Sequence, residues 1–256
     1  MSTGPKGPEQ LIEMHTPEGV SERLKKGTPQ SYLKDMVYGG IDGTITTFAI
    51  VSGVVGADLA SGIVVILGLA NLFADGFSMA VSNFLGTRAE QQFVHMVRTD
   101  EEREIELIPE GEREEIRQIY ARKGFDGDLL EQVVQVITSD KKVWVDTMLQ
   151  EEHSLSLEGP DPRRSAWLTF ITFIIAGSVP ITPFIINLVV NDGMSNPFLW
   201  SAIATATTFF AIGIFKAKVV RANKIRSGIE TVAIGGMAAT MAYGIGWLLR
   251  GVADNI

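Results

Sequence analysis

The 256-residue chain contains no cysteine and only three histidines. Without cysteine the chain has no disulfide bonds and no thiolate metal ligands. Charge is also missing from long stretches. Five segments of 19 to 29 residues carry at most one charged side chain each, and they are residues 36–57, 59–87, 165–190, 193–215 and 231–249. The charges within them are Asp42 and Asp75.

These five segments are long enough to cross a membrane. About 20 helical residues span the ~30 Å hydrocarbon core of a bilayer. A soluble protein can hide one such run as a buried helix, but five within 256 residues are hard to explain in that way. We therefore predict an all-α membrane protein with five transmembrane helices.

Lysine and arginine predict the orientation of the chain. Five of the 22 basic residues precede the first segment, eleven lie between the second and third, and five lie between the fourth and fifth. A single basic residue, Arg250, follows the last segment. The positive-inside rule then places the N-terminus in the cytoplasm and the C-terminus outside. The polar first 35 residues do not resemble a signal peptide, and we expect a cytoplasmic tail with a short helix there.

The acidic residues gather in one polar insertion. Residues 86–165 contain 19 of the 30 acidic residues and 11 of the 22 basic ones, which accounts for the whole net charge of −8. This acidity makes a nucleic-acid partner unexpected. The apolar periodicity predicts three helices in the insertion: 88–107 as an extension of the second span, 112–123, and 128–155. The predicted organisation is a cytoplasmic tail, spans one and two, an acidic cytoplasmic domain, and spans three to five, with bounds 1–35, 36–87, 88–163 and 164–256.

Three side-chain pairs in the acidic domain have helical spacing. Each pair lies on one face of its helix; the pairs are Glu101 with Glu104, Glu112 with Glu115, and Met148 with Glu152. Carboxylates that converge with a thioether would bind a divalent cation, and the sulfur favours transition metals over Mg²⁺ and Ca²⁺. The alternative is that these acidic helices are simply solvated. His95 and His153 are interpreted as surface residues, and the ExxH spacing of di-iron proteins does not occur.

A second polar set lies inside the apolar segments. Asn71, Asp75 and Met79 follow one another at intervals of four residues, and Asp42 stands among small residues in the first span. Intramembrane carboxylates are rare and usually face the bundle interior or a wet cavity. We interpret these four residues as part of a transport path, in which Asp42 binds either a proton or a cation. The alternative is that Asp42 and Asp75 lie near the membrane surface and contact lipid headgroups.

These motifs together resemble the vacuolar iron transporter family. The resemblance rests on YGGIDGTITTFAIVSGVVGA, GLANLFADGFSMAVSNFLGTRAE, the ExxE pairs and TMLQEEHSL, and it covers the chain from about Asp35 onward. It implies a dimeric five-span exporter of Fe²⁺, and often of Mn²⁺, driven by proton exchange. It also implies a membrane site that includes Asp42 and Met79 and a cytoplasmic site that uses the three pairs above.

The chain departs from the family pattern at two positions. Plant-like members have a second methionine where this chain has Leu149, and some members have an acidic residue near Asn71. A metal ion is expected as a bound substrate (Fe²⁺, Mn²⁺ or Zn²⁺) and not as a cofactor. The expected partners are protons, the lipid bilayer and a second copy of the chain, because Gly-rich stretches in spans one and two suit packing across a two-fold axis. The cell membrane is the favoured location, with a vacuolar membrane as the alternative.

Three rival functions remain open at this stage. The first is a membrane-bound di-iron oxidase, which the missing ExxH pairs disfavour. The second is a scaffold or sensor whose acidic domain binds a partner, which the polar groups inside the spans disfavour. The third is a transporter of another cation, such as Mn²⁺, Ca²⁺ or Zn²⁺.

Overall fold

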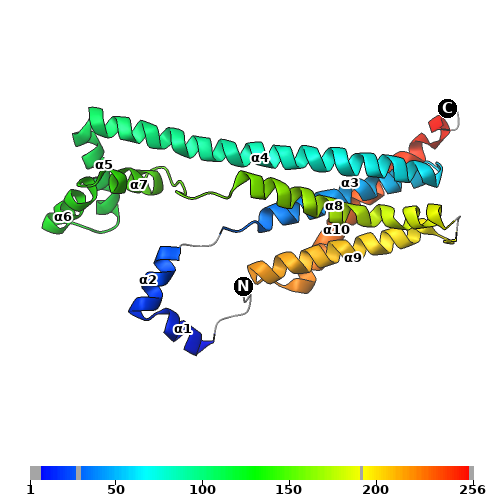
Figure 1. Cartoon of the computed structure of the whole chain (residues 1–256), viewed down its shortest axis with the longest axis horizontal. Coiled ribbons are helices and arrows are strands. Elements are labelled where there is room, and N and C mark those ends of the chain that lie inside the picture. The colour runs from blue at the N-terminus through cyan, green and yellow to red at the C-terminus, as the bar shows by residue number, and fades with distance from the viewer. Residues whose placement is uncertain (1–6, 27–29, 191–192, 254–256) are drawn as a thin grey trace. The chain divides into compact units, whose positions relative to one another are not determined.

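The computed structural model of the chain is helical, with no strand in the residues that it describes. Those residues form three ranges: 7–26, 30–190 and 193–253. The chain divides into two compact units. One unit is Leu85–Pro162, and the other combines the chain up to Phe84 with the chain from Arg163 onward. Helix α4 (Ser61–Leu107) contributes residues to both units (Figure 1).

Five helices that lie wholly or partly in the first unit are long and apolar enough to cross a membrane, counted over the described residues. They are α3 (Leu33–Gly56), α4, α8 (Pro162–Val189), α9 (Pro197–Val220) and α10 (Lys224–Ala253). Each predicted span overlaps one of them, so the predicted number of long apolar helices is confirmed. Helix α10 packs against α3 and α9, and α3 also packs against α9.

Glycines allow backbones in this unit to approach closely. A Cβ atom on Gly177 of α8 would lie 2.7 Å from the carbonyl oxygen of Gly43 in α3. A Cβ atom on Gly246 of α10 would lie 2.1 Å from the carbonyl oxygen of Gly53. Small residues at helix crossings are the usual means of tight packing in a membrane. The glycines of span one were expected to pack against a second copy, but at these positions they pack within the chain.

The N-terminal region contains two short helices, α1 (Pro8–Met14) and α2 (Pro17–Lys26). We expected a tail followed by one short helix, so α1 is an addition. Residues 1–6 and 27–29 of this predicted tail lie outside the described residues. Each helix begins with a proline, whose missing N–H is not needed in the first turn of a helix.

The second unit combines the end of α4 with α5 (Pro109–Arg122), α6 (Gly127–Thr138) and α7 (Lys141–Glu151). Apolar side chains of all four helices form its core, including Val97, Ile116, Val134, Trp144 and Leu149. The continuation of α4 to Leu107 matches the predicted extension of span two. Helix α5 begins three residues earlier than predicted, because Pro109 occupies its first position, where no backbone N–H is needed.

The predicted third helix of the acidic domain, 128–155, is wrong. The structure divides it at Ser139 into α6 and α7. The Asp140 carboxylate caps α7 by accepting hydrogen bonds from the backbone N–H groups of Lys142 (2.8 Å) and Val143 (3.1 Å). An aspartate cap of this kind starts a new helix, which the apolar periodicity did not reveal. After α5 the chain turns at Gly124, whose φ of +96° is a conformation that favours glycine.

Candidate metal sites

An acidic cluster joins three helices of the second unit. Helix α4 supplies Glu101, and the C-terminal end of α7 supplies Glu152 and His153. The Nε2 atom of His153 lies 2.7 Å from Glu101 Oε1 and 3.7 Å from Glu152 Oε2. One ligand atom of each residue lies within 4.8 Å of the others. The third helix, α5, adds Glu112 and Glu115, whose carboxyls interact electrostatically with Glu101 and Glu152.

Two glutamates of this cluster are buried with an unused oxygen. Glu112 is 1% exposed and Glu101 is 4% exposed. The Oε2 atom of each has no hydrogen-bond partner among the described residues. A buried polar atom without a partner is costly, and a buried charge without one costs more. A cation would satisfy both oxygens, so the donor chemistry of the cluster fits a metal ion.

The carboxyl groups of the glutamates on the three helices affect one another electrostatically. Burial, followed by the negative charges of Glu115, Glu101, Glu104 and Glu152, raises the pKa of the Glu112 carboxyl to about 7. Burial also raises the pKa of Glu115, with further contributions from the charge of Glu152 and a hydrogen bond to its side chain. All five predicted glutamates therefore lie within electrostatic range of one another. Such mutual repulsion is what a divalent cation would relieve.

Met148 is the sixth predicted ligand and has a different environment. Its side chain is fully buried in the hydrophobic core of the second unit. It lies one helical turn before Glu152, whose backbone N–H donates to the Met148 carbonyl oxygen at 3.0 Å. The structure thus places Met148 beside the cluster along α7, and its role as a thioether ligand stays a prediction.

His153 is the residue that sequence reasoning missed. His153 is exposed, as we expected of a surface residue, but it also belongs to the cluster. Its hydrogen bond to Glu101 raises the pKa of the imidazole, and the charge of Glu152 contributes in the same direction. The signal was its place directly after Glu152 in the run Glu151–Glu152–His153. Spacing rules for helices did not apply to it, because His153 lies just beyond the end of α7.

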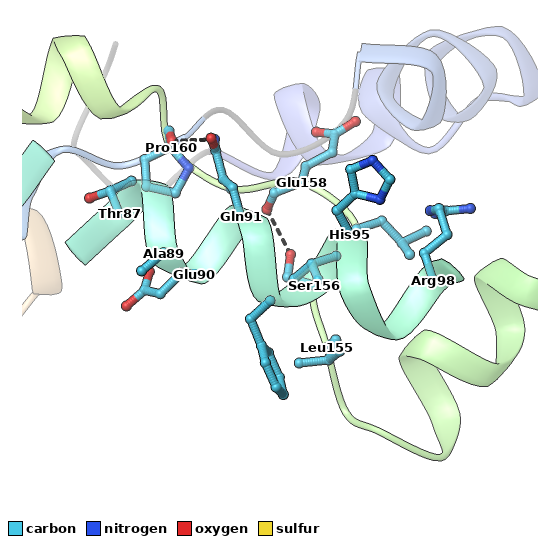
Figure 2. Close-up of a pocket in the computed structure, with 14 residues that line it drawn as sticks. Thr87, Ala89, Glu90, Gln91, His95, Arg98, Leu155, Ser156, Glu158 and Pro160 are labelled. Carbon is cyan, nitrogen blue, oxygen red and sulfur yellow. Dashed lines mark hydrogen bonds between the residues drawn. The ribbon is translucent and has the colours of Figure 1, made fainter. Parts of the chain in front are cut away.

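A pocket of about 890 Å³ lies next to α4 in the same unit, where the chain returns from α7 (Figure 2). The returning segment, residues 155–160, is held along α4 by a hydrogen bond from Gln91 Nε2 to the Pro160 carbonyl oxygen (3.0 Å). Within it the Ser156 hydroxyl donates to the Glu158 carbonyl oxygen (2.8 Å). His95 lines this pocket and not the acidic cluster. The segment begins two residues after His153.

The predicted transport-path residues lie on α3 and α4 in the first unit. Asp42, Asn71, Asp75 and Met79 are all half-buried. Asn71 Nδ2 donates to the Thr46 hydroxyl at 3.4 Å, and that hydroxyl donates to the Asp42 carbonyl oxygen at 2.9 Å. The carboxyls of Asp42 and Asp75 interact electrostatically. Met79 packs against a buried apolar cluster of the same unit. The structure therefore brings polar groups of α3 and α4 together within the apolar segments.

A further polar contact joins three helices of the first unit. The Asn83 side chain on α4 donates to Asp35 Oδ1 of α3 at 2.8 Å and to Thr169 Oγ1 of α8 at 2.7 Å. Asp35 and Thr169 are buried. Sequence reasoning missed this network, although Asn83 lies four residues after Met79 and continues the polar stripe of α4.

Comparison with known proteins identifies the family. The model of the VIT family matches residues 33–247. A vacuolar iron transporter of Toxoplasma gondii is 36% identical over 230 residues, which is 87% of this chain and 76% of that protein. A vacuolar iron transporter of Plasmodium falciparum is 31% identical over 85% of this chain and 82% of its own length. Vacuolar iron transporter 1 of Arabidopsis thaliana is 28% identical over 91% of this chain and 89% of its own length.

The matched region contains both candidate sites, from the polar groups of α3 and α4 to the acidic cluster of the second unit. It also contains all or most of each of the five long apolar helices. On the extent of the family match and the identity to these relatives, the chain belongs to the VIT family.

Proposed function

We propose that the protein transports a divalent metal ion, Fe²⁺ first and Mn²⁺ as well, out of the cytoplasm in exchange for protons. The relatives are named as iron transporters. The observation that carries the proposal is the pair of buried carboxylate oxygens on Glu101 and Glu112 that have no hydrogen-bond partner among the described residues. Glu101 also clusters with Glu152 and His153. Glu101 Oε1 is used by His153, and the remaining Oε2 atoms of Glu101 and Glu112 are the ones that a cation would satisfy.

The acidic cluster is the proposed capture site. It combines carboxylate oxygens from Glu101, Glu104, Glu112, Glu115 and Glu152 with an imidazole nitrogen from His153. Oxygen ligands alone suit Mg²⁺ and Ca²⁺, and an added nitrogen or thioether shifts selectivity toward Fe²⁺, Mn²⁺ and Zn²⁺.

The proposed path through the membrane uses Asp42, Asn71, Asp75 and Met79. Two carboxyls at membrane depth can carry either protons or a divalent cation, so the arrival of one cation displaces protons. In this chain Asn71 is an amide that donates to Thr46, so Asp42 and Asp75 carry the titratable charge of this set. This makes Asp42 and Asp75 the proposed site of metal and proton exchange.

The proposed topology has the N-terminus and residues 88–163 in the cytoplasm and the C-terminus outside, in a homodimer. The excess of Lys and Arg in the loops on one side supports this orientation. The names of the relatives refer to a vacuole. A vacuole-type membrane is therefore the first location to examine, together with the cell membrane.

Metal flux into proteoliposomes under a pH gradient tests the proposal. We expect Fe²⁺ uptake that collapses when the gradient is dissipated, and we expect Asp42→Asn to lose most of it. Asp128→Asn, an exposed residue of α6, is the matched control and should transport normally. Normal flux in Asp42→Asn would remove that residue from the mechanism. Oxygen consumption on addition of Fe²⁺, without flux, would favour the oxidase alternative.

A further inference from the structure

A groove of about 400 Å³ runs between α4 and α8 in the first unit. Four aromatic rings line it: Phe77 and Phe84 of α4, and Trp167 and Phe170 of α8. Small side chains such as Ala80 leave the space between these rings. The single charged residue in its lining is Arg163. The groove is thus an apolar slot with one cation in its wall.

The depth of the groove in the membrane follows from its residues. Arg163 lies two residues before the apolar segment 165–190, so it belongs to the cytoplasmic surface in the proposed topology. Phe77 lies ten residues inside the segment that ends at Thr87, which is about 15 Å along a helix. Half of a ~30 Å hydrocarbon core is about the same length. The groove therefore extends through one leaflet, which is the reach of one lipid acyl chain.

Arg163 has the surroundings of a phosphate-binding residue. It is exposed in the first turn of α8 and makes no ion pair within the described residues. By contrast, Arg98, Arg117 and Lys141 are each paired with a carboxylate. The N-terminus of a helix favours an anion, since its first N–H groups are unsatisfied. Trp167, one turn further along, is 64% exposed and is a residue type that is common at headgroup level.

We propose that this groove binds one anionic phospholipid of the cytoplasmic leaflet. Its acyl chain lies along the rings of Phe77, Phe84, Trp167 and Phe170, and its phosphate lies against Arg163 at the start of α8. The apolar slot alone would accept any acyl chain. Arg163 at the cytoplasmic end selects a headgroup with net negative charge. Its guanidinium attracts an anionic headgroup, whereas the positive group of a zwitterionic headgroup largely cancels the attraction of its phosphate.

Tryptophan quenching by brominated lipid tests this assignment on the full chain. One variant keeps only Trp167, with Trp144, Trp200 and Trp247 changed to Phe. In bilayers of brominated phosphatidylcholine we expect quenching of Trp167, and we expect phosphatidylglycerol to displace the brominated lipid with about fivefold preference. Arg163→Gln should remove this preference. A matched variant that keeps only Trp200, an exposed residue of α9, should show no preference for phosphatidylglycerol over phosphatidylcholine.

Two results would overturn the proposal. Absence of quenching at Trp167 would mean that protein covers the groove, as in contact with a second copy. Quenching with equal affinity for both lipids would mean that Arg163 does not select an anionic headgroup. Native mass spectrometry of the chain with its natural tryptophans gives an independent measurement. There we expect bound phosphatidylglycerol that is lost in Arg163→Gln, and equal retention in the two proteins would contradict the assignment.

Discussion

His153 and Glu101 are 52 residues apart in the chain, yet the imidazole Nε2 lies 2.7 Å from the carboxylate Oε1. This contact joins the C-terminal end of α7 to the C-terminal part of α4 within the second unit. It uses one oxygen of Glu101 and leaves the other, Oε2, buried with no hydrogen-bond partner in the part of the chain that the structure describes. The same side chain is therefore positioned by a histidine and left with an oxygen available for a cation.

Replacing His153 tests whether it binds metal. We expect His153→Ala to weaken Mn²⁺ binding by about tenfold or more, because it removes the nitrogen donor and frees Glu101 to move. Isothermal titration calorimetry of the purified chain in detergent measures this. His95→Ala changes the same residue type on α4, where His95 lines the neighbouring pocket, and should bind metal like the unaltered protein. Equal affinity in both variants would show that His153 is only a structural partner of Glu101.

Removing Glu104 and Glu115 together tests the convergence of α4 and α5. We expect Glu104→Ala with Glu115→Ala to lower the affinity for Fe²⁺, Mn²⁺ and Zn²⁺ by at least about tenfold. The control is Glu110→Ala with Glu131→Ala, which removes the same net charge from exposed ion pairs with Arg113 and Arg117. If calorimetry finds the same loss of metal affinity in both double variants, the loss comes from the lower net negative charge and not from removal of specific ligands.

The raised pKa of Glu112 predicts a pH dependence of stability. The unfolded chain releases this proton near its ordinary pKa of 4.5, whereas the folded unit retains it until about pH 7. The contribution of Glu112 to stability is therefore fully present below pH 4.5 and is lost as the pH rises to about 7. Without metal, we expect helices α5 and α7 to be less protected from amide hydrogen exchange at pH 7.5 than at pH 5, after correction for intrinsic rates.

Substitution of Glu112 separates the stability effect from the binding effect. Glu112→Gln keeps the size of the side chain and cannot ionise, so we expect most of this pH dependence to disappear. We also expect weaker metal binding at pH 7.5, because the carboxylate form is the ligand. A variant that keeps the full pH dependence would assign the effect to another group of the cluster.

Close packing of α3 against α8 predicts which glycines tolerate a methyl group. A Cβ atom on Gly43 would lie 2.5 Å from the Phe173 carbonyl oxygen, whereas one on Gly86 of α4 would meet nothing within 4 Å. We expect Gly43→Ala to cost about 1–3 kcal/mol through overpacking. Gly86→Ala should be neutral or stabilising, because alanine favours a helix.

The midpoint temperature for loss of monodisperse protein in detergent compares these two variants. A marked decrease is expected for Gly43→Ala and none for Gly86→Ala. Equal midpoints would indicate that α3 and α8 can separate slightly at no cost.

Local pattern was sufficient for much of this protein. The length and hydropathy of each apolar segment predicted the five long helices, because a span depends on about 20 neighbouring residues. Helical spacing also put Glu101 with Glu104 and Glu112 with Glu115 on common faces, since a helix brings residues three apart together. The turn at Gly124 follows from a single residue type that tolerates positive φ.

Tertiary structure decided the contacts between distant residues. His153 in the acidic cluster, and Asn83 between Asp35 and Thr169, depend on how helices return past one another, and no local spacing encodes that. The apolar periodicity also did not predict the division between α6 and α7, because core-facing apolar side chains occur on both sides of the cap at Asp140. The sequence by itself thus determined which segments are helical and apolar. The packing of those helices determined which acidic residues became buried, and it left the Oε2 atoms of Glu101 and Glu112 without a hydrogen-bond partner among the described residues.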